Sequence, residues 1–120
     1  MGLQHVKAFL DTFALLEMFQ ANRVYTVHLR QGVTGQLNLP EFHVHACRLR
    51  NEADADGAFR RLQSKVIPAE AADLLEASRV KRTVKGASYA DALGYAMAQR
   101  HRIPFVTGDR TFRGLPGVVP

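Results

Sequence analysis

The sequence has no tryptophan, a single cysteine and no long hydrophobic run. One cysteine cannot form an internal disulfide, so the disulfide-stapled secreted class is excluded and a reducing cytoplasm is the expected compartment. No stretch approaches the roughly 18 apolar residues of a membrane helix. The N-terminus also lacks the basic-then-apolar layout of a secretion signal. Glycine and proline are scattered, without repeats or low-complexity tracts. We therefore expect a single domain over residues 1–120 that is cytoplasmic and makes no contact with membranes.

The composition is that of a basic globular protein. Apolar residues make up 47% of the chain and charged residues 22%, which excludes an intrinsically disordered chain. Lysine and arginine number 16 against 11 acidic residues, for a net charge of +5. This balance fits either an ordinary soluble surface or a polyanionic partner such as nucleic acid, and net charge alone does not decide between them.

Short apolar runs alternate with helical patterns along the chain. Such alternation predicts a central parallel sheet with helices on both faces, that is, a Rossmann-like α/β/α sandwich of three layers. An acidic turn is expected at 52–56. The expected strands cover 6–10, 36–39, 66–68 and 103–106, with a last one starting at 118; the expected helices cover 13–20, 25–30, 40–50, 58–64, 69–84 and 88–102.

Acidic residues follow the expected strands or begin the expected helices. In a right-handed parallel sheet these positions share one edge, where ligands bind. Each acid alone also fits an ordinary role: a helix N-cap, a favourable charge in a first turn, a capping box with Ser88, or a turn residue. The four that we expect at this edge are Asp11, Glu41, Asp91 and Asp109.

Four converging carboxylates need compensation. Two carboxylates about 6 Å apart repel by about 3 kcal/mol at an effective dielectric constant near 20. The cluster must therefore take up a proton, gain a basic partner or bind a cation. Oxygen ligands favour Mg²⁺ or Mn²⁺, which suit phosphodiester hydrolysis. We expect Arg102, Arg110 and Arg113 near this edge to bind phosphates, although any of them could equally be a solvated surface charge.

Four segments resemble the motifs of PIN domains, in the family's order. They are Phe9–Glu17, Leu37–Phe42, Ser88–Leu93 and Phe105–Val118. The resemblance implies a metal-dependent endoribonuclease, often the toxin of a VapBC-type toxin–antitoxin pair. Such toxins are usually homodimers and are silenced by an antitoxin that plugs the acidic groove.

Carried over residue by residue, the resemblance implies that Asp11, Glu41, Asp91 and Asp109 bind the metal and act in catalysis. The hydroxyls of Thr107 and Thr12 would support the acidic cluster.

The chain departs from the family pattern at two places. Phe13 stands where Asn or Ser often orders the site, and Arg110 and Thr111 stand where some members have a further acid. These departures keep open a second hypothesis, a non-catalytic PIN-like module that binds protein or RNA. A receiver domain needs paired acids near the N-terminus, which this chain lacks. We expect Glu17 to face solvent, and we single out Tyr89 as a candidate for stacking on substrate bases.

Overall fold

The computed structural model describes residues 8–120 and is built on an all-parallel sheet. The strand order is β3-β2-β1-β4-β5, with β1 in the centre. Phe9 pairs with Val33 on one side and with Phe105 on the other. The strands are β1 (Ala8–Leu10), β2 (Gly32–Gly35), β3 (Val66–Ile67), β4 (Phe105–Val106) and β5 (Val118–Val119).

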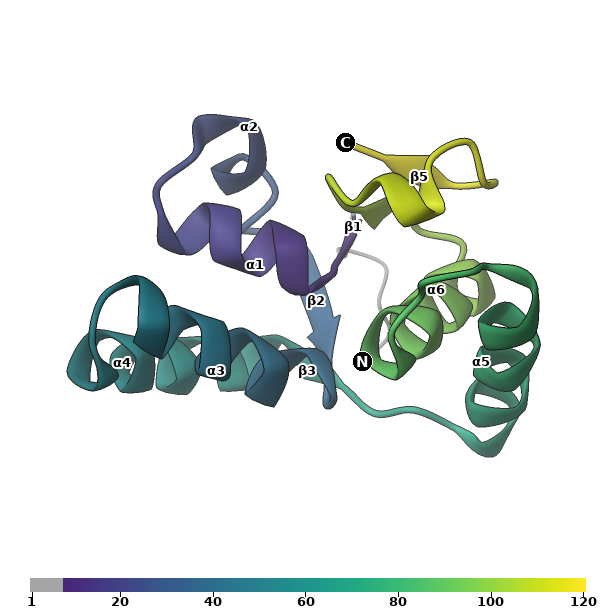
Figure 1. The fold of residues 1–120 in the computed structure, drawn as a ribbon, viewed down its shortest axis with the longest axis horizontal. Helices are drawn as coiled ribbons and strands as arrows, with labels where there is room; N and C mark the ends of the chain where they lie inside the picture. Colours follow the sequence, from purple (N-terminus) through teal and green to yellow (C-terminus); the bar gives the residue numbers. More distant parts are fainter. Residues whose placement is uncertain (1–7) are drawn as a thin grey trace.

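Helices cover both faces of the sheet, as expected, so the predicted three-layer α/β class is confirmed (Figure 1). Phe9 and Phe105 point to one face, against α5 and α6, while Leu10 and Val106 point to the other, against α1–α4. No helix within residues 8–120 could cross a membrane. The helices are α1 (Thr12–Phe19), α2 (Arg23–Thr26), α3 (Asn38–Leu49), α4 (Glu52–Leu62), α5 (Ala71–Thr83) and α6 (Tyr89–His101), with the 3₁₀ turns η1 (Gln63–Lys65) and η2 (Arg110–Phe112).

The strand expected at 36–39 is wrong, because the second strand is Gly32–Gly35 and α3 already begins at Asn38. Its terminal glycines look like strand breakers in the sequence. In the structure they allow close packing: a Cβ added to Gly32 would lie 2.5 Å from Cδ1 of Leu10. A side chain at this position would push β2 away from the central strand.

The acidic turn expected at 52–56 is also wrong, because this segment is the first turn of α4. The Asn51 side chain accepts a hydrogen bond from the Asp54 backbone N–H at 2.8 Å and so caps the helix. Acidic residues in a first turn face the positive end of the helix dipole, which stabilises the helix. The expected start of the first strand, Val6, lies outside the described residues, and the strand is seen from Ala8.

Candidate active site

Asp11 follows the central strand and is fully buried. Its Oδ1 accepts a hydrogen bond from the Ala14 N–H at 2.8 Å, so the residue is the N-cap of α1. Its Oδ2 has no hydrogen-bond partner among the described residues. Capping therefore accounts for one oxygen of this carboxylate and leaves the other buried and unsatisfied, which is costly unless a ligand or a proton compensates it.

Asp91 repeats this situation in the first turn of α6. The Ser88 hydroxyl accepts a hydrogen bond from the Asp91 N–H at 3.0 Å, as an N-cap should. The expected capping box is nevertheless incomplete within residues 8–120, because Asp91 Oδ1 is buried without a partner. In α5, by contrast, Glu70 and Asp73 make both bonds of such a box. The capping role thus explains Ser88 but not the carboxylate of Asp91.

Glu41 is held by a short relay of side chains. The Thr12 hydroxyl donates to Oε1 of Glu41 at 2.5 Å, and the buried amide of Asn38 donates to Oγ1 of Thr12 at 3.2 Å. The relay joins the start of α1 to the first turn of α3. Thr12 thereby orients Glu41, a predicted metal ligand in α3.

Asp109 lies after β4, in a turn organised by Thr107. Its carboxylate accepts from the Thr111 N–H, and its own N–H donates to the Thr107 hydroxyl, each at 2.9 Å. Thr107 is buried, whereas Asp109 is partly exposed. The hydroxyl of Thr107 therefore fixes the backbone that presents Asp109.

The electrostatics show that the predicted acids lie near one another. Burial and the charge of Asp91 raise the pKa of Asp11 to about 8, and Asp109 adds to this shift. The Ala14 N–H and the nearby Thr107 hydroxyl oppose it. Burial, followed by the charges of Glu41 and Asp109, raises the pKa of Asp91 to about 6. No lysine or arginine from the described residues contributes to either shift, so these carboxylates repel one another without a basic partner.

The donor set fits a hard divalent cation. Buried, unpartnered carboxylate oxygens that repel one another are stabilised by an ion such as Mg²⁺ or Mn²⁺. As the side chains stand in residues 8–120, no three His, Cys, Asp or Glu residues are close enough to enclose a metal ion. The acids are therefore near enough to influence one another's pKa, but their side chains do not form a complete set of metal ligands.

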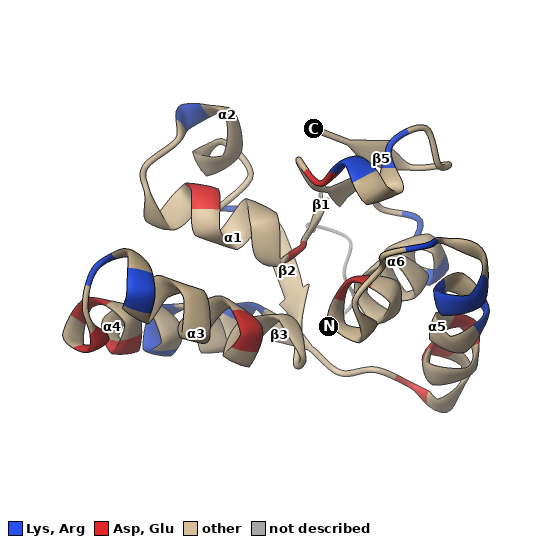
Figure 2. Ribbon diagram, in the orientation of Figure 1, with Lys and Arg blue, Asp and Glu red and all other residues tan. Residues whose placement is uncertain are grey.

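The basic residues are only partly where the sequence predicted them. Arg110 and Arg113 are exposed in and just after η2, directly beyond Asp109. Arg102 is instead the C-cap of α6. Eleven helical steps separate it from Asp91, about 16 Å at 1.5 Å per residue, so Arg102 lies at the far end of α6, just before β4, and its role in substrate binding stays a prediction. Figure 2 shows acidic segments of β1–α1, α3 and α6 around the centre of the view, further acidic segments on α4 and α5, and basic segments on α2, α4, α5 and beside β5.

Two positioning groups were not identified from the sequence, and one acid was misplaced. Asn38 starts the relay to Glu41, and the buried Thr34 hydroxyl donates to the Leu10 carbonyl at 2.7 Å, tying β2 to the strand before Asp11. Glu17, expected in solvent, is half-buried and accepts a bond from the Asn22 side chain at 3.0 Å. Asn38 could have been identified from the sequence, because it is a polar residue between two leucines in an otherwise apolar motif.

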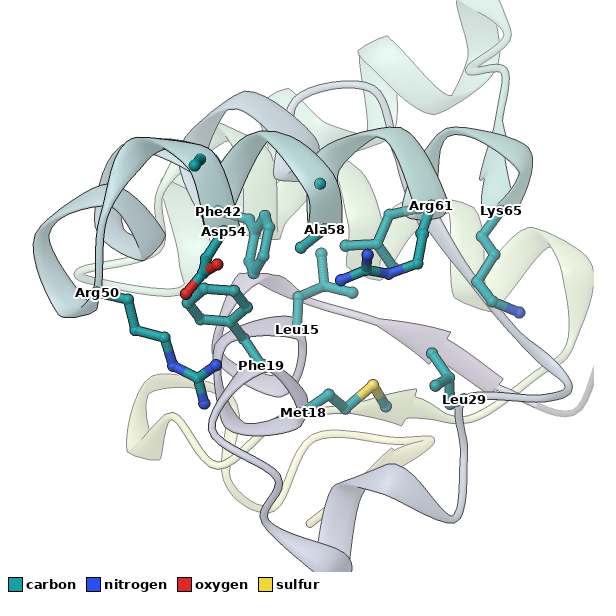
Figure 3. Close-up of a pocket in the computed structure, with 13 residues that line it drawn as sticks. Leu15, Met18, Phe19, Leu29, Phe42, Arg50, Asp54, Ala58, Arg61 and Lys65 are labelled. Atoms are coloured by element: carbon teal, nitrogen blue, oxygen red, sulfur yellow. The ribbon is translucent and has the colours of Figure 1, made fainter.

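An apolar groove lies apart from the acids, between α1 and the α3–α4 hairpin (Figure 3). Leu15, Phe19 and Phe42 form part of its floor, and the Arg50 guanidinium lies 4.8 Å from the centroid of the Phe19 ring. Arg61 and Lys65 also line it. None of the four predicted acids lines this groove, so the molecule has an acidic centre and a separate surface that is apolar with basic residues beside it.

Comparison with known structures reveals the same fold in several proteins. A toxin–antitoxin complex from Klebsiella pneumoniae contains a chain with 24% identity and a TM-score of 0.74, covering 95% of this chain and 97% of that one. PAE2754 from Pyrobaculum aerophilum has 22% identity and a TM-score of 0.70, covering 95% and 90%. The Mycobacterium tuberculosis VapC20 toxin, which cleaves the sarcin–ricin loop, has 19% identity and a TM-score of 0.70, covering 86% and 90%.

Comparison with curated protein sequences found no match. The PIN domain family model, however, matches residues 8–118, a range that includes all four acids and nearly the whole of the described fold. The chain therefore belongs to the PIN domain family.

Proposed function

We propose that the protein is a divalent-metal-dependent endoribonuclease and the toxin of a VapBC-type pair. The unpartnered oxygens of Asp11 and Asp91, buried together without a basic neighbour in residues 8–120, are the observation that carries the proposal. A purely structural acid would be capped or paired on both oxygens. Family membership and the toxin structures with the same fold support the same reaction class.

In this proposal Asp11, Glu41, Asp91 and Asp109 hold a Mg²⁺ or Mn²⁺ ion. The ion would neutralise charge on the phosphodiester and supply an activated water. Thr12 keeps Glu41 oriented through the 2.5 Å hydrogen bond, and Thr107 holds the backbone of Asp109. The hydroxyls therefore act by placing the carboxylates in advance.

Substrate binding is assigned to the basic residues beyond the acids. Arg110 and Arg113 are exposed next to Asp109, where they can hold phosphates that flank the scissile bond. Tyr89 is 66% exposed in the first turn of α6, and the Lys81 ammonium lies 4.8 Å from the centroid of its ring. A base could stack on this aromatic side chain two residues before Asp91.

The test measures cleavage of a labelled RNA by the purified protein with Mg²⁺, with Mn²⁺ and with a chelator. Cleavage should require the cation, and Asp91→Asn should abolish it. The matched control is Asp54→Asn, which changes the same helix position of α4, where the N-cap side chain also accepts the aspartate N–H. If neither ion binds and no RNA is cleaved, the protein is a non-catalytic PIN-like module instead.

We further propose that an antitoxin docks in the groove between α1 and the α3–α4 hairpin. Its apolar floor is lined by three basic residues, Arg50, Arg61 and Lys65, and by one acidic residue, Asp54. This excess of positive charge suits an amphipathic segment that carries carboxylates. The test co-expresses the product of a small neighbouring gene, and Arg61→Glu should weaken its co-purification. A wild-type protein that captures no such product would refute the proposal.

We also propose that the protein is a homodimer. Leu74 and Leu75 are each 58% exposed at adjacent positions of α5, and exposed apolar residues that lie together are candidates for a protein interface. Light scattering of the wild type should give twice the chain mass, and Leu74→Glu should give the monomer. A wild-type monomer at micromolar concentration would contradict this assignment.

A further inference from the structure

Cys47, the only cysteine of the chain, lies beside a histidine that an aspartate holds in place. Its Sγ is 3.8 Å from both ring nitrogens of His43, which stands one turn earlier in α3. Nε2 of His43 and Oδ1 of Asp56, in α4, lie 2.6 Å apart. A thiol, an imidazole and a carboxylate are thus brought together where the two helices of the α3–α4 hairpin meet.

The imidazole of His43 is fixed on two sides. An ionised carboxylate can only accept hydrogen bonds, so the contact with Asp56 places the N–H of a neutral ring on Nε2. Nδ1 is then left as an acceptor that faces the Cys47 thiol. The Phe59 ring packs edge to face with the imidazole, with 5.5 Å between the centroids and 83° between the planes. Asp56 and Phe59 together hold the ring in the orientation that a base for the thiol requires.

This cluster is separate from the acidic centre and from the groove proposed for the antitoxin. Glu41 precedes His43 by two residues, about 200° around the helix, and bonds to Thr12 of α1 instead. None of the residues that line the groove belongs to the cluster. A reaction at Cys47 would therefore take place on the other side of the hairpin.

A pocket of about 550 Å³ opens beside the histidine. Such a volume is that of a site for a small molecule. The Cys47 side chain is partly exposed, and the exposed guanidinium of Arg60 can pair with a carboxylate. The pocket is lined by His43, Asp56, Phe59, Arg60 and Gln63.

We propose that Cys47 is a modification site, where the thiol exchanges with a small anionic disulfide and retains one half of it as a mixed disulfide. The Cys47 sulfur attacks one sulfur of the disulfide, and the original S–S bond breaks. Cys47 is oxidised, and the departing half is reduced to a thiol. The proton that Cys47 loses passes to His43 and then to the departing sulfur. Arg60 pairs with a carboxylate of the retained half. The inference is independent of the proposed nuclease function.

The test measures the rate at which the purified protein forms an adduct with glutathione disulfide, followed by the mass of the intact chain. Because the chain has one cysteine, every adduct reports on Cys47. His43→Gln should lower the second-order rate constant about tenfold. The matched control is His45→Gln, which removes an exposed histidine two residues from Cys47 and should leave the rate unchanged.

A second comparison tests the pocket. Arg60→Gln should lower the rate with glutathione disulfide, which carries carboxylates, and leave the rate with the neutral hydroxyethyl disulfide unchanged. Equal effects on the two reagents would refute the recognition of an anionic compound.

Two further results would overturn the inference. A folded His43→Gln variant that reacts as fast as the wild type would show that the imidazole does not assist the thiol. The wild type can also be compared with its own urea-unfolded chain, which needs no variant that folds. Cys47 should react faster in the folded chain, whereas a slower reaction there would show that the fold shields the thiol.

Discussion

Replacing Asp91 by asparagine should stabilise the metal-free protein while destroying its activity. The carboxyl has a pKa of about 6 in the folded chain against 3.8 as the ordinary value. Below pH 3.8 both states are protonated and the shift costs nothing. Between pH 3.8 and 6 the unfolded state ionises while the folded state is still protonated, so the folded state progressively loses stability. Just over two pKa units correspond to about 3 kcal/mol once the pH is well above 6.

The expected gain is smaller than that penalty, because the asparagine amide must also be kept from water. We expect Asp91→Asn to raise the free energy of unfolding by about 1–3 kcal/mol at pH 8 and to have little effect at pH 4. Urea unfolding followed by circular dichroism at both pH values measures this difference. The variant keeps the hydrogen bond that the backbone N–H of residue 91 donates to the Ser88 hydroxyl.

The control variant is Asp54→Asn, at the same position of α4 but exposed. Asp54→Asn loses a favourable charge in a first turn, so its free energy of unfolding should fall by about 0.3–1 kcal/mol, whereas that of Asp91→Asn should rise. If Asp91→Asn behaves like this control at pH 8, Asp91 is an ordinary helix-terminal acid and the argument from charge repulsion is wrong.

Further predictions follow from the same contacts. Mn²⁺ at a concentration 100 times its dissociation constant should stabilise the wild type by about 2.7 kcal/mol at pH 8, measured as a rise in melting temperature that Asp91→Asn lacks; no rise would refute the metal site. Thr12→Val removes the hydroxyl that donates to Glu41 and should lower RNA cleavage at least tenfold. Its circular dichroism spectrum should match that of the wild type. Full activity would show that this hydrogen bond does not contribute to cleavage. Gly108→Ala should lower the unfolding free energy by about 1–3 kcal/mol in urea titrations, since its Cβ would overlap the Phe13 ring and the Tyr25 hydroxyl; wild-type stability would contradict that close packing.

The position of the acids could be inferred from sequence because strand ends and helix starts share one edge of a parallel sheet. That rule holds whatever the side chains do, so it located Asp11 and Asp109 by strands, and Glu41 and Asp91 by helix starts. The same rule separates Arg102 from the acids, because a helix that starts at this edge ends at the opposite one.

Contacts between distant segments could not be inferred in this way. The bond from Thr12 to Glu41 joins residues 29 positions apart, and the unpartnered oxygens depend on how two helical layers close over the sheet. The strand at Gly32–Gly35 was missed for a similar reason, since a Cβ at Gly32 would meet the Leu10 side chain and one at Gly35 would meet Asn38 and Phe9. Each of these features is set by packing, which a single sequence records only indirectly.

The two helical layers each contribute to the acidic centre: Glu41 comes from α3 on one face of the sheet and Asp91 from α6 on the other. If the proposed function holds, RNA cleavage needs both layers, because loosening of either layer separates two of the predicted metal ligands before the whole chain unfolds. Heat inactivation should then precede or coincide with loss of circular dichroism and never lag behind it. A chain with only one layer in place would have no cleavage activity.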